Sequence, residues 1–473
     1  MDRAQAGLGI LGAVRARVDE RFPSDLERIR EYLRLPSVSA TGEGIREVAH
    51  ATAGWIQDAG GRAEVVETGG HPLVLGEVSG PQGAPRLLRY GMYDVQPAEE
   101  ITWTSPPFGA EIRDLPEIGQ AVVCRGSANS KGCLAAFFIA LDILRELRSL
   151  PVTIALMVEG EEELGSPHLE AAVRAHRDDL SAEAAFDLDL TAGLDGRPEL
   201  ITGCKGLLTL EVSAAGGEWG GPRIPLHSSE QAWIASPVWA LVHSLAALTG
   251  PDERITVNAF SDQVRPPSAT DMETLDRLAD QFDLEEHLRE ARAVRYRREG
   301  SPRDLLEDLL FRPTMNINGL EAGYTGPGGK TIIPSEARAV LDIRLVPDME
   351  ADATAEAVRR HLEASGFGHI RVETQETYPW AKADPGSAVA RALATSYDAL
   401  DVAHLPYPLA PWCAPYFVFD RVLELPWASG GVGHASGAHG PDEYATVDGL
   451  KEHIVGAAAF LLAYPSARRG TRA

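Results

Sequence analysis

The chain has 473 residues, of which 44% are hydrophobic and 24% charged, a composition typical of a folded globular protein rather than a disordered or fibrous one. Its formal net charge of -25, from 69 acidic and 44 basic side chains, argues against nucleic acid and anionic membrane surfaces as partners, because like charges repel. The length is about three times that of a typical domain, so two or more domains are expected.

The cysteines and the apolar segments indicate a cytoplasmic protein. Four cysteines, at positions 124, 133, 204 and 413, are too few and too scattered for a disulfide framework or a cysteine zinc site. The apolar stretch 7–14 is short and lacks a cleavage-site pattern, so it is predicted to be the buried face of a first helix. No stretch is long enough to span a bilayer.

In chain order, apolar spacing predicts two helices between Asp2 and Leu33 and a third from Ile45 to Ala59. Two strands, 63–66 and 73–78, follow. The stretch Leu87 to Pro97, L-L-R-Y-G-M-Y-D-V-Q-P, then predicts a buried strand with a carboxylate, Asp94, at its carboxyl end. Open α/β sheets place their chemistry at that edge.

A loop and hairpin over 98–123 and a helix over 134–150 lead to a second buried strand, 152–158. The acids that follow it are costly to bury unless they are solvated, metal-bound or protonated. One interpretation is a solvated helix N-terminus. Flanking glycines favour instead a tight turn that aims the side chains inward. The acids are Glu159, Glu161, Glu162 and Glu163.

Two further segments carry ligand-type residues. A strand over 184–190 places Asp187 and Asp189 on one side of an otherwise apolar pattern. His439 lies in G-A-H-G-P-D-E before a final helix, a short loop able to position one ring nitrogen, although a loop histidine is more often structural. Oxygen ligands with one imidazole suit zinc, manganese or cobalt.

The middle of the chain has a different pattern. Alternating strands at 207–214 and 337–346, with helices at 236–248 and 351–364, predict an inserted α+β domain over residues 207–377. The long charged segment from 266 to 308 is predicted to be helical and exposed. The fold class predicted is α/β, with residues 1–206 and 378–473 forming one domain around a mixed, largely parallel sheet flanked by helices.

Together these segments resemble the co-catalytic dizinc metallopeptidase family of aminoacylases, carboxypeptidase G, desuccinylases and carnosinase-type dipeptidases, most closely the carnosinase-like branch. The resemblance runs from about Ala13 to Ala463 and implies a catalytic domain interrupted by a lid or dimerisation domain, in a homodimer. Its motifs include R-G-S-A-N-S-K-G at 125–132, L-H-S-S at 226–229, N-I-N-G-L-E-A-G-Y-T-G-P-G-G-K at 316–330 and L-D-I-R at 341–344.

The resemblance also implies catalytic and substrate-binding roles. Glu162 would be the general base that activates water, and Asp94 would orient a ligand or tune the site. His227 would steady the carbonyl oxyanion, commonly from the partner subunit. The substrate would be a small amino-acid derivative with a free carboxylate. The residues implied to bind it are Arg344, Gly328 and Lys330.

The metal ligands match the family only in part. Glu163 and His439 match ligands of one metal, and Asp189 matches a ligand of the other. The family has histidine where this chain has Met92, and a bridging aspartate where it has Asn129. A thioether is a poor ligand for zinc or manganese, and a neutral amide offers one weak oxygen donor.

These departures leave several hypotheses open. One metal on Glu163 and His439 would support hydrolysis of an amide bond in a dipeptide or N-acyl amino acid, which is the leading hypothesis. Without a metal, the carboxylates would serve acyl transfer, elimination or isomerisation. A third hypothesis is a non-catalytic homologue in which methionine only fills space. Cys124 and Cys133, considered as replacement ligands, are interpreted as packed thiols.

Overall fold

The computed structural model describes residues 3–98, 102–291 and 293–469, so the predicted helix start at Asp2 and residues 99–101 of the predicted loop lie outside it. The chain divides into two compact units, each described here by itself. Unit 1 consists of Met1–Gly203, Lys382–Pro408 and Tyr416–Ala473, and unit 2 consists of Cys204–Ala381 and Leu409–Pro415.

Unit 1 is built on an eight-stranded sheet. Its strands are β1 (Arg62–Val66), β2 (Leu73–Val78), β3 (Arg86–Met92), β6 (Thr153–Glu159), β7 (Ala184–Leu188), β8 (Glu199–Ile201), β17 (Leu405–Tyr407) and β18 (Trp427–Gly430). They lie in the order β1-β2-β6-β3-β7-β18-β8-β17. The pairs β3–β6, β3–β7, β7–β18 and β8–β17 are parallel, whereas β1–β2, β2–β6 and β8–β18 are antiparallel. The predicted mixed, largely parallel sheet is confirmed.

The central strands explain the apolar runs in the sequence. All residues of β7, and all but the first of β3 and of β6, are buried. Strands covered on both faces need apolar side chains throughout rather than in alternation. Because β6, β3 and β7 are neighbours and parallel, their carboxyl ends meet at one edge of the sheet.

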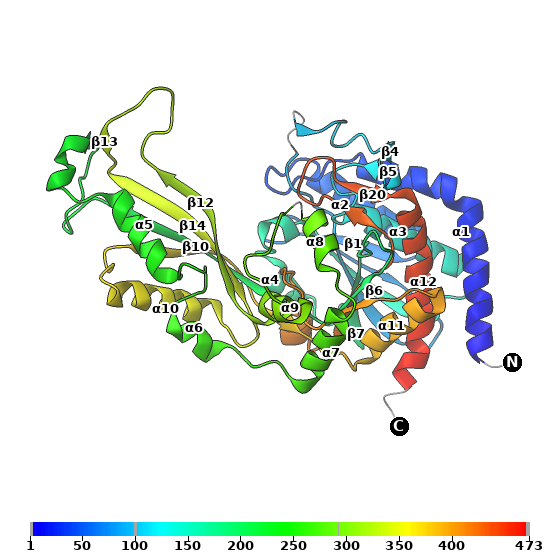
Figure 1. Ribbon diagram of the computed structural model, residues 1–473. Coiled ribbons are helices and arrows are strands. Elements are labelled where there is room, and N and C mark those ends of the chain that lie inside the picture. Colours follow the sequence, from blue (N-terminus) through cyan, green and yellow to red (C-terminus); the bar gives the residue numbers. More distant parts are fainter. Residues whose placement is uncertain (1–2, 99–101, 292, 470–473) are drawn as a thin grey trace. The chain divides into compact units, whose positions relative to one another are not determined.

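Five helices of unit 1 pack around this sheet and each other (Figure 1): α1 (Arg3–Leu33), α2 (Ile45–Asp58), α3 (Lys131–Glu146), α11 (Ala388–Leu400) and α12 (Val447–Arg469). The prediction of two helices before residue 33 is wrong, since α1 continues through Pro23. Buried Phe22 and Leu26 keep one apolar face across the proline. Among the described residues, no helix is long and apolar enough to cross a bilayer.

A small four-stranded sheet brings two distant loops of unit 1 together. Its order is β19-β20-β5-β4, formed by β4 (Glu111–Leu115), β5 (Gly119–Val123), β19 (Ala435–Ser436) and β20 (Tyr444–Thr446). Val123, the last residue of β5, pairs with Tyr444, the first residue of β20. The loop that follows residue 123 therefore begins beside the loop that ends at residue 443.

Unit 2 contains a four-stranded antiparallel sheet in the order β12-β14-β10-β15, of which Figure 1 labels β12, β14 and β10. Its strands are β10 (Gly206–Ala215), β12 (Thr314–Ala322), β14 (Glu336–Leu345) and β15 (Arg371–Tyr378). Helices α5 (Pro237–Leu248) and α10 (Ala351–Ala364) pack against it. The charged segment is helical as predicted, in three pieces: α7 (Ala269–Ala279), α8 (Leu284–Glu290) and α9 (Pro302–Phe311).

Candidate functional site

The candidate site of unit 1 begins at the carboxyl end of β3. Asp94 is fully buried two residues beyond the strand. Its carboxylate accepts the backbone N–H of Glu162 at 3.2 Å and of Glu163 at 3.1 Å. Asp94 therefore ties the segment after β6 to the end of β3, as expected when neighbouring parallel strands deliver polar residues to one edge.

The acidic segment after β6 is a tight turn. A 3₁₀ turn spans Glu162–Leu164, and Gly165 ends it with φ of 86°, a left-handed conformation that suits glycine. At Gly160 a Cβ would lie 2.3 Å from the Tyr93 hydroxyl, so no larger residue fits. The side chain of Glu163 is only 4% exposed. The alternative of a solvated helix N-terminus is therefore wrong.

Burial raises the pKa values of this cluster, because charged carboxylates lose their hydration there. The pKa of Asp94 rises to about 7. Burial and the neighbouring Glu163 raise the pKa of Glu162 well above its ordinary range. Burial raises the pKa of Glu159 to about 8, although the Tyr90 hydroxyl donates to it at 2.8 Å. These carboxyl groups therefore bind protons at a higher pH than exposed carboxyl groups do.

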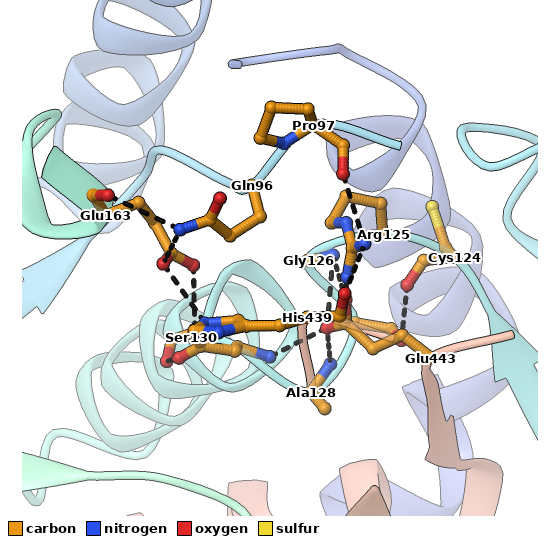
Figure 2. A network of polar contacts seen from close by, with 12 residues as sticks. Gln96, Pro97, Cys124, Arg125, Gly126, Ala128, Ser130, Glu163, His439 and Glu443 are labelled. Carbon is orange, nitrogen blue, oxygen red and sulfur yellow. Dashed lines mark hydrogen bonds and ion pairs between the residues drawn. The ribbon is translucent and has the colours of Figure 1, made fainter. Parts of the chain in front are cut away.

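Three polar side chains surround the carboxylate of Glu163, and Figure 2 labels two of them, Gln96 and His439. Asn129 Nδ2 donates to Oε1 at 2.9 Å, and Gln96 Nε2 donates to Oε2 at 2.9 Å. His439 Nε2 lies 3.1 Å from Oε2, and this carboxylate raises the pKa of the imidazole. A carboxylate only accepts hydrogen bonds, so all three nitrogens direct protons at Glu163.

Glu443 and Arg125 form a buried ion pair beside this group (Figure 2). Their relative exposures are 0% and 2%, and Arg125 Nη1 lies 2.6 Å from Oε2 of Glu443. Sequence reasoning assigned neither residue a role. Arg125 stands in the motif that contains Asn129, and Glu443 stands in the motif that contains His439. Because 318 positions separate Arg125 from Glu443, no local sequence pattern predicts their pairing.

Asp189 lies beyond β7 in a different setting. Its Oδ1 is 2.8 Å from the thiol of Cys133, which is itself fully buried. Burial and the neighbouring Asp187 raise the pKa of Asp189. Asp187 forms a buried ion pair with Arg89 and accepts the Tyr416 hydroxyl at 2.6 Å. The charge of Asp187 is thus paired inside the protein.

Among the described residues, no group of three or more histidine, cysteine, aspartate or glutamate side chains is arranged to hold a metal. Asn129 turns its nitrogen toward Glu163 while its oxygen accepts the Ser130 hydroxyl at 2.9 Å. Met92 is buried at the end of β3 and supplies only a neutral sulfur. Glu163 and His439 remain as two converging donors.

The other predicted site residues belong to unit 2. His227 is exposed, with Nδ1 2.9 Å from Ser229 Oγ and Nε2 3.1 Å from Thr331 Oγ1. Arg344 lies in β14, where Nη2 contacts Asp342 at 3.1 Å. Lys330 is exposed beside Tyr324, its Nζ 4.3 Å from the ring centroid, and Gly328 has φ of 77°.

Comparison with known proteins identifies the family. Residues 89–463 match the sequence profile of Peptidase family M20/M25/M40. The chain belongs to this family. It is 27% identical to the Cys-Gly metallodipeptidase dug1 of Schizosaccharomyces pombe, over 73% of this chain and 74% of that protein. It is 29% identical to the Beta-Ala-His dipeptidase of Rattus norvegicus, over 62% of this chain but only 58% of that protein.

A solved structure agrees with this assignment. An M20 family metallo-carboxypeptidase from Sulfolobus solfataricus superposes with a TM-score of 0.85 at 30% identity, covering 93% of this chain and 99% of that one. The predicted family is confirmed, including its likeness to carnosinase-type dipeptidases. By family, this M20 chain is a dipeptidase-like hydrolase.

Proposed function

We propose that this M20 protein hydrolyses the amide bond of a dipeptide or N-acyl amino acid that has a free carboxylate. The observation that carries the proposal is the position of Glu162, beside Glu163 on a turn tied to Asp94. The relatives named as Cys-Gly and Beta-Ala-His dipeptidases act on substrates of this chemistry. A retained base and a peptidase scaffold together favour amide hydrolysis.

Glu162 is the general base of the proposed reaction. It takes a proton from the attacking water and returns it to the leaving nitrogen, so the acyl carbon gains hydroxyl as the C–N bond breaks. The surroundings that raise the pKa of Glu162 also make it a stronger base than an exposed glutamate. Asp94 holds the turn that carries it, through two backbone N–H groups.

We further propose that the site holds at most one divalent metal, such as zinc, manganese or cobalt. Glu163 and His439 would hold it, because both match ligand positions of the family and their donor atoms lie 3.1 Å apart. Asn129 would be a weak third ligand through its amide oxygen. A bound cation would supply positive charge that polarises the amide carbonyl. The position that needs Met92, Asn129 and Asp189 lacks the charge to hold a second one.

Unit 2 is proposed to serve as lid and dimerisation domain in a cytoplasmic homodimer. His227 would steady the oxyanion of the tetrahedral intermediate. Arg344 would grip the substrate carboxylate with its planar fork, helped by Gly328 and Lys330. Exposed apolar side chains of unit 2 support a role in subunit contact: Ile224, Trp233, Trp239, Val242, Ile317 and Leu320.

The test is the metal content of protein purified without added metal or chelator, combined with a panel of dipeptides and N-acyl amino acids. About one equivalent of a transition metal per protomer, lost in His439→Ala together with turnover, is the expected result. Two equivalents would contradict the mononuclear proposal. Turnover of no member of the panel by the metal-loaded protein would contradict amide hydrolysis.

A second candidate is metal-independent acid–base chemistry on the same scaffold, such as acyl transfer, elimination or isomerisation. The hydrogen bonds from Asn129 and Gln96 to Glu163 favour it, because they satisfy that carboxylate without a cation. Protonated carboxylic acids at Asp94 and Glu162 would then act as proton donors. Turnover that survives exhaustive chelation would favour this candidate, and strict dependence on added metal would remove it.

A further inference from the structure

The carboxylate of Glu443 fixes the backbone that carries Asn129. Oε1 accepts the N–H of Ala128 and of Asn129, each at 2.9 Å. Both carboxylate oxygens lie 3.1 Å from the N of Gly126. Three donors that converge on one buried, charged acceptor hold the loop in a single position. Asn129 therefore presents its amide to Glu163 from a fixed backbone.

Arg125 carries this restraint to the loop of His439. While Nη1 pairs with Glu443, Nη2 donates to the carbonyl oxygens of His439 at 3.2 Å and Pro97 at 3.3 Å. The guanidinium is planar, so its N–H directions are fixed relative to one another. His439 has φ of 65°, a left-handed conformation that a residue with a side chain keeps only where its surroundings hold it.

The loop that carries Trp103 and Thr104 covers the ion pair, and hydrogen bonds to Asp442 hold this loop in place. The ring of Trp103 lies over Arg125, with its centroid 5.2 Å from the guanidinium carbon. Thr104 donates to Asp442 Oδ1 through its backbone N–H at 2.9 Å and its hydroxyl at 3.0 Å. Hydrogen bonds kept from water in this way are stronger and hold their geometry better than exposed ones.

We propose that Glu443 and Arg125 are positioning residues, which set Asn129 against one oxygen of Glu163 and His439 against the other. They act through backbone groups, since their contacts go to N–H and carbonyl groups of the two loops rather than to Glu163. The effect on turnover rests on the proposed hydrolysis at this site. The effect on the His439 ring does not.

The test compares Arg125→Lys, Glu443→Gln and the double variant. Lysine keeps the charge beside Glu443 but loses the fork that reaches His439. Glutamine keeps one oxygen for the backbone N–H groups but turns an amide nitrogen toward Arg125. The matched control is Arg21→Lys, because Arg21 is likewise an arginine of unit 1 whose fork makes several contacts, including Asp142 and Glu146, each at 2.7 Å.

The first readout is the ring resonance of His439 in histidine-labelled protein, identified by its loss in His439→Ala. We expect it to shift in Arg125→Lys and Glu443→Gln and to stay in place in Arg21→Lys. The second readout is turnover. We expect kcat to fall about 100-fold with KM within about threefold, because a misplacement of about 1 Å has that effect. The double variant should lose no more than either single one.

A wild-type His439 resonance in folded Arg125→Lys would overturn the proposal. The proposal would also be overturned if Arg125→Lys and Arg21→Lys lowered Tm equally and Arg125→Lys lowered kcat no more than Arg21→Lys did. Arg125 and Glu443 would then have only a structural role. Should Glu443→Gln not fold, Arg125→Lys decides alone because it keeps the charge pair. If the wild-type protein turns over no amide, the proposed function fails, and the ring resonance still decides the positioning role.

Discussion

The side-chain nitrogen of Asn129 lies 2.9 Å from Oε1 of Glu163 and donates a hydrogen bond to it. The family resemblance implies a metal-bridging aspartate at the position of this amide. The amide of Asn129 turns its nitrogen rather than its oxygen toward Glu163, because an ionised carboxylate accepts hydrogen bonds and cannot donate them. Replacing Met92 and Asn129 by the family's histidine and aspartate should therefore remove this hydrogen bond and allow cations to bind.

The variant Met92→His with Asn129→Asp is expected to bind one more divalent cation per protomer than the parent protein. The histidine supplies a nitrogen ligand and the aspartate supplies charge and a second oxygen beside Asp189. Elemental mass spectrometry after zinc loading and desalting measures the gain. Met92→Leu with Asn129→Asp is the control, since it lacks the nitrogen ligand. An unchanged metal count in the first variant would contradict the prediction.

Glu162→Gln is expected to lower kcat/KM by about 10² to 10⁴, the usual contribution of a general base. Glutamine has nearly the same shape but cannot accept the proton of water. Glu161→Gln is the matched control, because Glu161 is a neighbouring buried acid paired with His168 at 2.9 Å. Steady-state kinetics on a confirmed dipeptide substrate measures both. Equal turnover in Glu162→Gln and the parent would rule out the assigned role.

Arg344→Lys is expected to raise KM for carboxylate-bearing substrates about 10-fold or more, because a lysine cannot make the bidentate contact. The same substrates with the carboxylate converted to an amide should lose affinity for the parent protein and change little between parent and variant. Arg338→Lys is the control on the same strand, where the exposed Arg338 pairs with Glu321. A KM that rises equally for the amidated substrates would contradict a carboxylate grip.

His453 makes part of the stability depend on pH. Burial lowers its pKa to about 4, from an ordinary value of 6.5, and its Nδ1 bonds to the carbonyl of Val432 at 3.1 Å. Between these two values the unfolded chain binds a proton that the folded chain does not, so stability falls as pH falls through 6.5 toward 4. This difference in pKa corresponds to a loss of stability on the order of 3 kcal/mol.

Urea unfolding at pH 7.5 and pH 5 measures this effect. His453→Gln should lose less stability between the two pH values than the parent, because glutamine does not titrate. His50→Gln serves as the control, because His50 is exposed on α2, and it should leave the pH dependence unchanged. A pH difference of the same size in His453→Gln and the parent would show that His453 contributes nothing to it.

Ile317→Asp with Leu320→Asp is expected to convert the proposed homodimer to monomer. Both residues lie on β12, an edge strand of the unit 2 sheet, and are 51% and 58% exposed. Charged side chains on an exposed edge oppose strand pairing and remove apolar contact. Sedimentation velocity measures the change. Ile112→Asp, at a 40% exposed position on β4 in unit 1, should leave the assembly intact.

The parts of the site that follow one strand could be predicted from the sequence. Asp94 and the acidic turn come directly after buried apolar runs, and parallel strands deliver such residues to one edge. The extent of α1 could not be read in the same way. A proline normally ends a helix, yet Pro23 is accommodated because the apolar face continues on both sides of it.

Ion pairs between residues far apart in the chain could not be predicted from local sequence patterns. Arg89 stands inside an apolar run, and nothing near it in sequence explains a buried cation. Its partner Asp187 comes from β7, the neighbouring strand in space, and the rings of Phe137 and Phe186 flank its guanidinium at 5.3 and 5.9 Å. Likewise, Glu443 and Arg125 come into contact because β5 and β20 pair in the small sheet.

The contact between Glu443 and the loop of Asn129 also sets when the site can form as the chain is made. Synthesis reaches Asn129 first and Glu443 only 314 residues later. Until then, the N–H groups of Gly126, Ala128 and Asn129 lack the acceptor that orders them. Because domains fold as units once their segments are available, a nascent chain that ends before residue 439 carries an unassembled site, however complete its sheet.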